Sequence, residues 1–130
     1  MELPIKLSEQ SREPIYHQIE HQIKALIASG QLEAGTSLPS IRALSKDLEV
    51  SVITTRRAYQ NLEYEGFIKT LQGKGTFVAD INVSLKKEIK EDTVANALRK
   101  AIGTAYQHNY SKKEVKRLFN QLLDESEGES

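Results

Sequence analysis

The chain has 130 residues, of which 38% are hydrophobic and 28% are charged, and its 18 basic residues are balanced by 18 acidic residues. This composition is typical of one ordinary globular domain with a small appendage. The absence of cysteine excludes disulfides and thiolate zinc sites. No run approaches 18 apolar residues and the N-terminus carries no signal pattern, so we expect a cytoplasmic protein with no membrane partner.

The first predicted helix follows a polar, irregular segment over residues 1–13. It begins at Pro14, because the missing N–H of proline costs nothing in the first turn of a helix. Its apolar side chains recur at spacings of three and four residues and form one stripe, made of Ile15, Ile19, Ile23, Leu26 and Ile27. Gly30 ends this helix.

Two short helices are predicted next, after a connector over residues 32–37. Ser40 is a suitable N-cap for the first of them, and Ser51 for the second. The turn between them is so short that the helices must cross, as in a helix-turn-helix. The inward face of the second helix is expected to consist of Thr55, Ala58, Tyr59 and Leu62.

A hairpin is predicted after Gly66. β-Branched and aromatic residues at 67–71 and 76–78 flank the sequence Gln72-Gly73-Lys74-Gly75. Glycine supplies the positive φ that a hairpin tip needs, so these residues favour a short antiparallel pair of strands.

Two further helices are expected toward the C-terminus. Ser84 is a candidate cap for the first, and the chain breaks again at 108–110. Ser111 and Glu114 then have the spacing of a capping box. Residues 125–130 are acidic and small and are expected to be disordered.

The apolar stripes of these last helices need a surface to cover, because two helices make a poor core of their own. A second copy of the chain is the expected partner, while a stripe that folds back on the first helix is the alternative. The residues predicted to form the homodimer interface are Leu98, Ile102, Val115, Leu118, Phe119 and Leu122.

The distribution of charge matters more than its sum. No acidic residue occurs from 50 to 62 or from 66 to 79, although both stretches contain basic residues. A protein that binds DNA through one face needs only that face to be positive. The helix-turn-helix and the hairpin therefore predict double-stranded DNA as the partner.

The second helix of such a motif enters the major groove. Its outward positions here are Val52, Ile53, Arg56, Arg57 and Gln60. Arg56 or Arg57 could donate to guanine while an aliphatic side chain meets a thymine methyl group.

Phosphate contacts are expected around this helix. Ser51 and Thr54 lie at its N-terminus, where backbone N–H groups favour anions. Arg42 lies one turn into the preceding helix. The hairpin tip, with Gly73, Lys74 and Gly75, lacks bulk and can approach the DNA backbone closely.

Residues 13–79 resemble the DNA-binding domain of the GntR family of bacterial transcription regulators. The motifs that carry the resemblance are Pro14-Ile15-Tyr16, the run from Gly35 to Leu44, and the run from Gly73 to Val78. The resemblance implies that Arg42, Ser51, Thr54, Arg56 and Gly75 contact DNA.

The short two-helix tail resembles the YtrA-type subfamily, which implies a homodimer, usually a repressor, on an inverted-repeat operator. The chain departs from the family pattern at Ile41 and Val52, where many members have an acidic residue and an arginine. The loss of that arginine removes one potential guanine contact.

Parts of the sequence also match other classes of function. His17-Gln18-Ile19-Glu20-His21 matches the H-x-x-E-H pattern of some zinc peptidases but has no evident third ligand, since the only other histidine is His108. The Gly73–Thr76 sequence lacks the spacing of a phosphate-binding loop. A winged helix that binds protein through Val52 and Ile53 is the remaining alternative.

The sequence thus predicts a mainly α protein with a small β-hairpin that is not an enzyme and needs no cofactor or metal. Its expected parts are a winged helix-turn-helix at 1–80, a two-helix dimerisation segment at 81–124 and an acidic tail at 125–130. Whether a small-molecule effector exists is left open, because a pocket of about 300 Å³ would have to form at the dimer interface.

Overall fold

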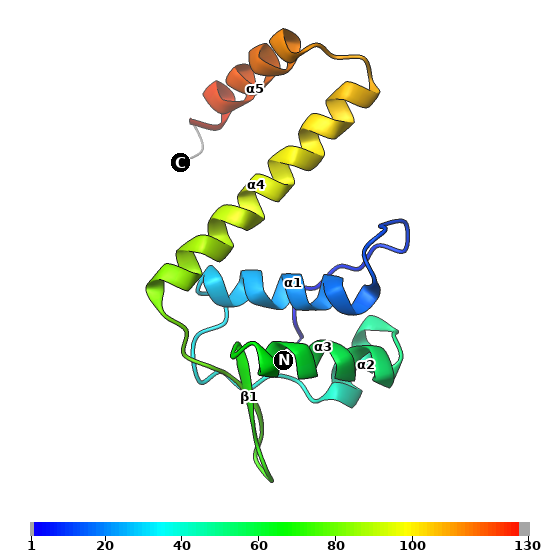
Figure 1. Cartoon of the computed structure of the whole chain (residues 1–130), viewed down its shortest axis with the longest axis vertical. Helices are drawn as coiled ribbons and strands as arrows, with labels where there is room; N and C mark the ends of the chain where they lie inside the picture. The colour runs from blue at the N-terminus through cyan, green and yellow to red at the C-terminus, as the bar shows by residue number, and fades with distance from the viewer. Residues whose placement is uncertain (1, 128–130) are drawn as a thin grey trace. The chain divides into compact units, whose positions relative to one another are not determined.

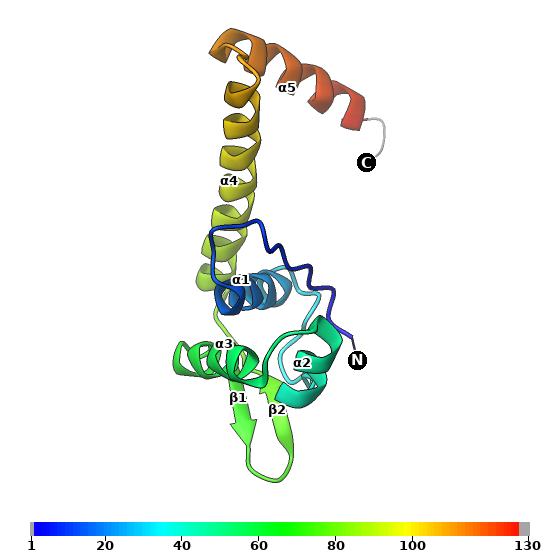
Figure 2. The ribbon, with the colours of Figure 1, turned by 90° about the vertical axis from the view of Figure 1, so that its right-hand side faces the viewer.

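A computed structural model describes residues 2–127 (Figures 1 and 2). The chain divides into two compact units, with the boundary between Glu91 and Asp92. The elements of the first unit are α1 (Ile15–Ala28), α2 (Ile41–Leu48), α3 (Val52–Tyr64), β1 (Ile68–Leu71) and β2 (Gly75–Val78). Helix α4 (Val83–Gln107) crosses the boundary, and α5 (Lys112–Glu127) lies in the second unit. This order confirms the predicted fold class, a winged helix-turn-helix followed by helices.

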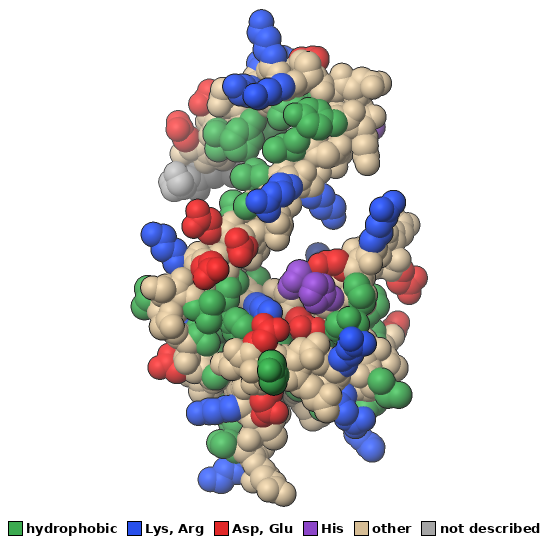
Figure 3. Space-filling model, in the orientation of Figure 1, with side chains coloured by type: hydrophobic (Ala, Val, Ile, Leu, Met, Phe, Trp, Pro, Cys, Tyr) green, Lys and Arg blue, Asp and Glu red, His purple; other side chains and the backbone are tan. Residues whose placement is uncertain are grey.

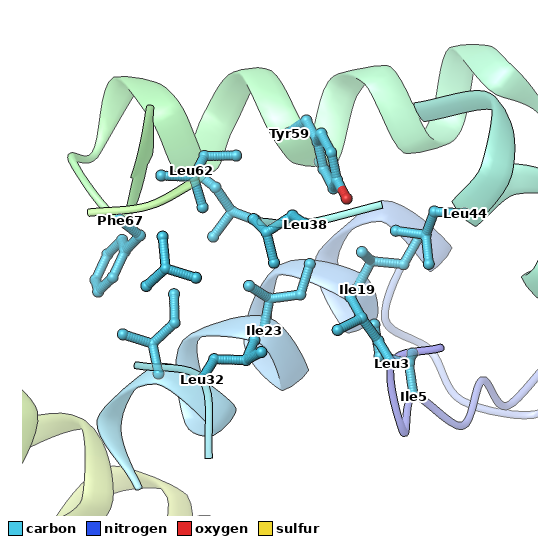
Figure 4. Close-up of a cluster of buried hydrophobic side chains, with 14 of the residues drawn as sticks. Leu3, Ile5, Ile19, Ile23, Leu32, Leu38, Leu44, Tyr59, Leu62 and Phe67 are labelled. Atoms are coloured by element: carbon cyan, nitrogen blue, oxygen red, sulfur yellow. The ribbon is translucent and has the colours of Figure 1, made fainter. Parts of the chain in front are cut away.

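Helices α1, α2 and α3 enclose the core of the first unit (Figure 4). Ile19 and Ile23 of α1 are completely buried against Leu62 of α3, and Leu44 of α2 closes one end. Burying a side chain of this size contributes about 1.5–3 kcal/mol to the stability of the fold. The apolar stripe predicted for the first helix is therefore the stripe that holds the three helices together.

The N-terminal segment contributes more than its polar sequence indicates. It is irregular, as expected, but Leu3 and Ile5 are buried in the core. The side chain of Gln22 pins this segment to α1, since its amide accepts from the backbone N–H of Lys6 at 2.9 Å and donates to the Lys6 carbonyl at 2.7 Å.

The two helices of the helix-turn-helix begin at the predicted caps. The Ser40 hydroxyl accepts from the Ala43 N–H at 3.0 Å, and the Ser51 hydroxyl accepts from the Thr54 N–H at 3.0 Å. Between them Glu49 has a φ of 57°, the left-handed conformation that ends many helices and usually calls for glycine. The turn is therefore made by a residue that gives no turn signal in the sequence.

The hairpin has the register Ile68↔Val78 to Leu71↔Gly75. The connector before α2 pairs with the other edge of β2, because the Leu38 N–H donates to the Thr76 carbonyl at 2.8 Å and the Val78 N–H donates to the Thr36 carbonyl at 2.9 Å. The base of the hairpin is thus braced on its second side by a segment that was predicted only as a connector.

Helix α4 begins earlier than Ser84. Asn82 is the cap, since its Oδ1 atom accepts from the Leu85 N–H at 2.8 Å. Leu85 and Ile89 then pack against the core of the first unit. For this reason the compact units divide inside α4, whereas the sequence placed a boundary after residue 80.

The break between α4 and α5 falls at 108–110, where Asn109 has a φ of 64°. The capping box predicted after it is present: the Ser111 N–H donates to the Glu114 carboxylate at 3.0 Å, and the Glu114 N–H donates to the Ser111 hydroxyl at 3.1 Å. Hydrogen bonding of the Glu114 carboxylate to the Ser111 backbone and side chain lowers the pKa of Glu114.

The sequence predicts disorder from residue 125, but helix α5 continues to Glu127, so residues 125–127 are helical. The Ser126 hydroxyl donates to the Leu123 carbonyl at 2.8 Å and helps to complete this last turn. Residues 128–130 of the predicted tail lie outside the described residues.

Candidate nucleic-acid interface

Helix α3 is divided sharply into two faces. Thr55, Ala58, Tyr59 and Leu62 are buried, as predicted. The opposite face carries Ile53, Arg56, Arg57 and Gln60, all of which are exposed. Ile53 has 76% of its surface exposed, which is unusual for a large apolar residue beside two arginines. This face is open to a partner.

Val52 and Thr54 lie at the margin of the exposed face, because both are half-buried. The hydroxyl of Ser51 caps α3 and also donates to the Thr54 hydroxyl at 2.7 Å. Both hydroxyls therefore lie at the N-terminus of the helix, where the helix dipole and unpaired N–H groups attract phosphate.

The basic residues differ in how firmly they are held. The Arg57 guanidinium carbon lies 3.9 Å from the centre of the Tyr16 ring of α1, a cation–π contact that fixes the side chain. Within residues 2–127, Arg56 and Arg42 are exposed and form no ion pair. Arg56 thus remains available to a partner.

The hairpin extends away from the helices in both ribbon views (Figures 1 and 2). Its tip is exposed, and Gly73 and Gly75 have φ angles of 79° and 114°. The backbone N–H of Lys74 donates to the Leu71 carbonyl at 2.9 Å, so the side chain is the part of Lys74 left for a partner. A glycine on each side keeps the approach to Lys74 free of bulk.

Two partly buried hydrogen bonds hold α3 against α1 and the segment before α2. The Tyr59 hydroxyl donates to the Pro39 carbonyl at 2.7 Å and ties α3 to the residue before the cap of α2; burial raises the pKa of this hydroxyl. The Asn61 amide donates to the buried Glu20 carboxylate of α1 at 3.1 Å. These contacts carry no local sequence signal, because each joins residues at least 20 positions apart.

The second unit carries an apolar surface of its own. No residue from 92 to 127 is buried, and the predicted interface residues are all at least partly exposed. The exposed fraction is 41% for Leu98, 45% for Phe119 and 51% for Leu122. Val115 and Leu118 are half-buried. Figure 3 shows apolar side chains gathered on α5 and the end of α4.

The two enzyme interpretations do not fit the geometry. In the H-x-x-E-H sequence, the Glu20 carboxylate is buried and bonded to Asn61 rather than placed beside an exposed metal site. The Gly73–Thr76 sequence turns between two strands and does not lead into a helix, as a phosphate-binding loop must.

Taken together, the crossed helices, the exposed basic face of α3 and the projecting hairpin define a winged helix-turn-helix DNA-binding protein. Residues 15–78 match the model of the gntR family of bacterial regulatory proteins. The chain is 33% identical to the HTH-type transcriptional repressor YtrA of Bacillus subtilis, over 92% of this chain and 90% of that protein. The chain therefore belongs to the GntR family of transcriptional regulators and is not an enzyme.

Solved structures show the same relationship. A GntR family transcriptional regulator from Listeria monocytogenes is 28% identical, with a TM-score of 0.65 over 86% of this chain and 97% of that one. The DNA-binding domain of AraR in complex with operator ORX1 is 33% identical, with a TM-score of 0.50 over 61% of this chain and 92% of that one. The match to AraR concerns the DNA-binding part of the chain.

No helix among residues 2–127 is both long enough and apolar enough to cross a membrane.

Proposed function

We propose that this regulator is a homodimeric repressor that binds an inverted-repeat operator in double-stranded DNA. Its work on DNA makes the cytoplasm the proposed compartment. Repression is supported by the similarity to the repressor YtrA, because the match covers nearly the whole length of both chains. The observation that carries the proposal is the exposed face of α3, on which Ile53 and Arg56 are presented without a partner among the described residues.

Base reading is assigned to the middle of that face. Arg56 has the free guanidinium that a bidentate contact with guanine O6 and N7 requires. Ile53 is the apolar neighbour suited to a thymine methyl group, with Val52 beside it at the margin. Arg57 is held over Tyr16, so its remaining N–H groups are suited to a fixed contact at the edge of the groove.

Phosphate contacts are assigned to the surrounding residues. Ser51 and Thr54 lie at the N-terminus of α3, and Arg42 lies on the exposed side of α2. Lys74 at the hairpin tip, between Gly73 and Gly75, adds a positive charge that can reach the DNA backbone beside the major groove. Such contacts give affinity without base preference.

Dimerisation is assigned to the apolar surface of the second unit. An exposed surface of this kind usually marks an interface, and a two-fold dimer buries the same patch on both copies. Two recognition helices related by that two-fold axis would read half-sites about 34 Å apart, or a multiple of that distance. An inverted repeat is the DNA sequence with matching symmetry.

The test is a selection experiment on genomic DNA. The purified protein is mixed with fragments of its host's DNA, and the bound fragments are recovered and sequenced over a salt series. We expect one inverted repeat to be enriched, with affinity that falls steeply as salt rises, because phosphate contacts release counterions. Placing that repeat in a reporter promoter then measures repression.

An Arg56→Ala variant run in parallel is the control, since it should lose enrichment of the repeat while its weak binding to all fragments remains. Failure to enrich any sequence at any salt would contradict the proposal. It would instead favour the alternative in which the exposed Ile53 anchors a protein partner.

A further inference from the structure

We propose that Glu13, His17 and His21 form a binding site for a divalent transition-metal ion, with zinc as the best match. The ligand atoms of these three residues all lie within 4.8 Å of one another. His17 and His21 lie in the N-terminal half of α1 and Glu13 lies just before it; histidine and acidic side chains adjoin at the surface there (Figure 3).

The separations between the ligand atoms are compatible with a shared metal ion. The Nδ1 atoms of His17 and His21 lie 3.4 Å and 3.2 Å from the same Oε1 atom of Glu13. These are the distances of ion pairs when the imidazoles are protonated, and both are longer than the commonest N–H···O hydrogen-bond length of about 2.9–3.0 Å. Two ligands of a tetrahedral zinc ion, each about 2.0–2.1 Å from the metal, are about 3.3–3.4 Å apart. The two nitrogen–oxygen separations are close to that value.

The local structure holds the ligands in this arrangement. His17 and His21 are four residues apart on one helix, so their rings lie one above the other, with centres 4.4 Å apart. Glu13 precedes the helix and is held by the buried side chain of Gln18, whose amide donates to the Glu13 carbonyl at 2.9 Å. The same side chain accepts from the Ser8 N–H at 2.9 Å, which fixes the loop that carries Glu13.

The donor set indicates which ion is bound. Two imidazoles and one carboxylate favour zinc and its neighbours over magnesium or calcium, which prefer oxygen. Nearly half of each of the three side chains is exposed, so an ion can enter from solvent and keep water in a fourth position. The carboxylate that could act as a base, Glu20, is bonded to Asn61, so the site is one for binding and not for catalysis.

The test is a calorimetric titration of the untagged, EDTA-treated full chain with zinc chloride, with and without excess magnesium. We expect one zinc ion per chain and no competition from magnesium. His17→Ala and His21→Ala should each weaken binding about tenfold or more, and Glu13→Gln should also weaken it. Alanine is a strong helix former, and circular dichroism would verify that α1 is retained.

His108→Ala is the matched control, because His108 is also exposed but lies far along the chain, after α4. Its zinc affinity should equal that of the unchanged chain. Absence of zinc binding at micromolar protein, or equal binding by the unchanged chain and a His17→Ala/His21→Ala double variant, would overturn the proposal. An equal loss in His108→Ala would do the same.

Discussion

Arg56 and Arg57 are adjacent in the sequence but lie in different surroundings. The Arg57 guanidinium rests on the Tyr16 ring, whereas Arg56 is exposed and forms no ion pair within residues 2–127. Only a free guanidinium can approach a guanine edge with both of its outer nitrogens. Helical periodicity left either arginine as the base reader and the family resemblance named Arg56; the contact of Arg57 with Tyr16 also favours Arg56.

Substitution of Arg56 by alanine should therefore cost about 1–3 kcal/mol of binding to the specific operator and relax the base preference at one position. Fluorescence anisotropy with the selected operator and with random DNA measures both. Lys90→Ala, in the exposed part of α4, serves as a control for lost charge. Equal losses on operator and random DNA would show that Arg56 meets phosphate and not a base.

The Tyr59 hydroxyl should contribute to stability rather than to DNA contact. Tyr59→Phe leaves the Pro39 carbonyl without its donor, which should lower the free energy of unfolding by about 1–3 kcal/mol. Urea denaturation measures the change. Tyr64→Phe is the matched control, since Tyr64 is 93% exposed, and similar losses in the two variants would contradict the role given to the Pro39 contact.

At the scale of elements, the hairpin is the part most easily tested by itself. Lys74→Ala should weaken binding to all DNA sequences alike and lower the slope of log affinity against log salt by about one unit, because one phosphate contact is removed. A salt series on operator and random DNA measures this. A slope that does not change would mean that Lys74 never meets phosphate.

Elements with local signals were predicted well from the sequence. Ser40, Ser51 and Ser111 each cap the helix that follows, because a cap and its N–H partner are only three residues apart. The turn at Glu49 and the irregular start of the chain were harder. Glu49 carries no turn signal, and the burial of Leu3 and Ile5 is decided by the core that they join.

The candidate sites show the same division. The outward face of α3 follows from helical periodicity, so Ile53 and Arg56 could be placed on it. Glu13 was missed as a companion of the two histidines, because the loop before α1 brings it there through hydrogen bonds of Gln18 that no periodic pattern encodes. Short-range order is readable in this chain, and loop geometry is not.

For the whole molecule, the proposed homodimer depends on the apolar surface of the second unit. Phe119→Glu should place a charge in the proposed interface and convert the dimer to a monomer, since a buried unpaired charge costs several kcal/mol. Sedimentation equilibrium measures the mass, and operator binding should weaken in parallel. Lys116→Glu, on the same helix, is the control for added negative charge. A Phe119→Glu dimer that persists would refute this placement.

The two faces of α3 have a consequence for how this protein could acquire new targets. The buried face of α3, with Leu62 and Tyr59, packs against the core, and Asn61 beside it bonds to Glu20 of α1. Ile53, Arg56 and Gln60 are exposed, so substitutions at these proposed base-reading positions should change the promoter that is recognised without lowering the stability of the fold. The fold and the DNA sequence that the protein recognises should therefore be able to diverge independently.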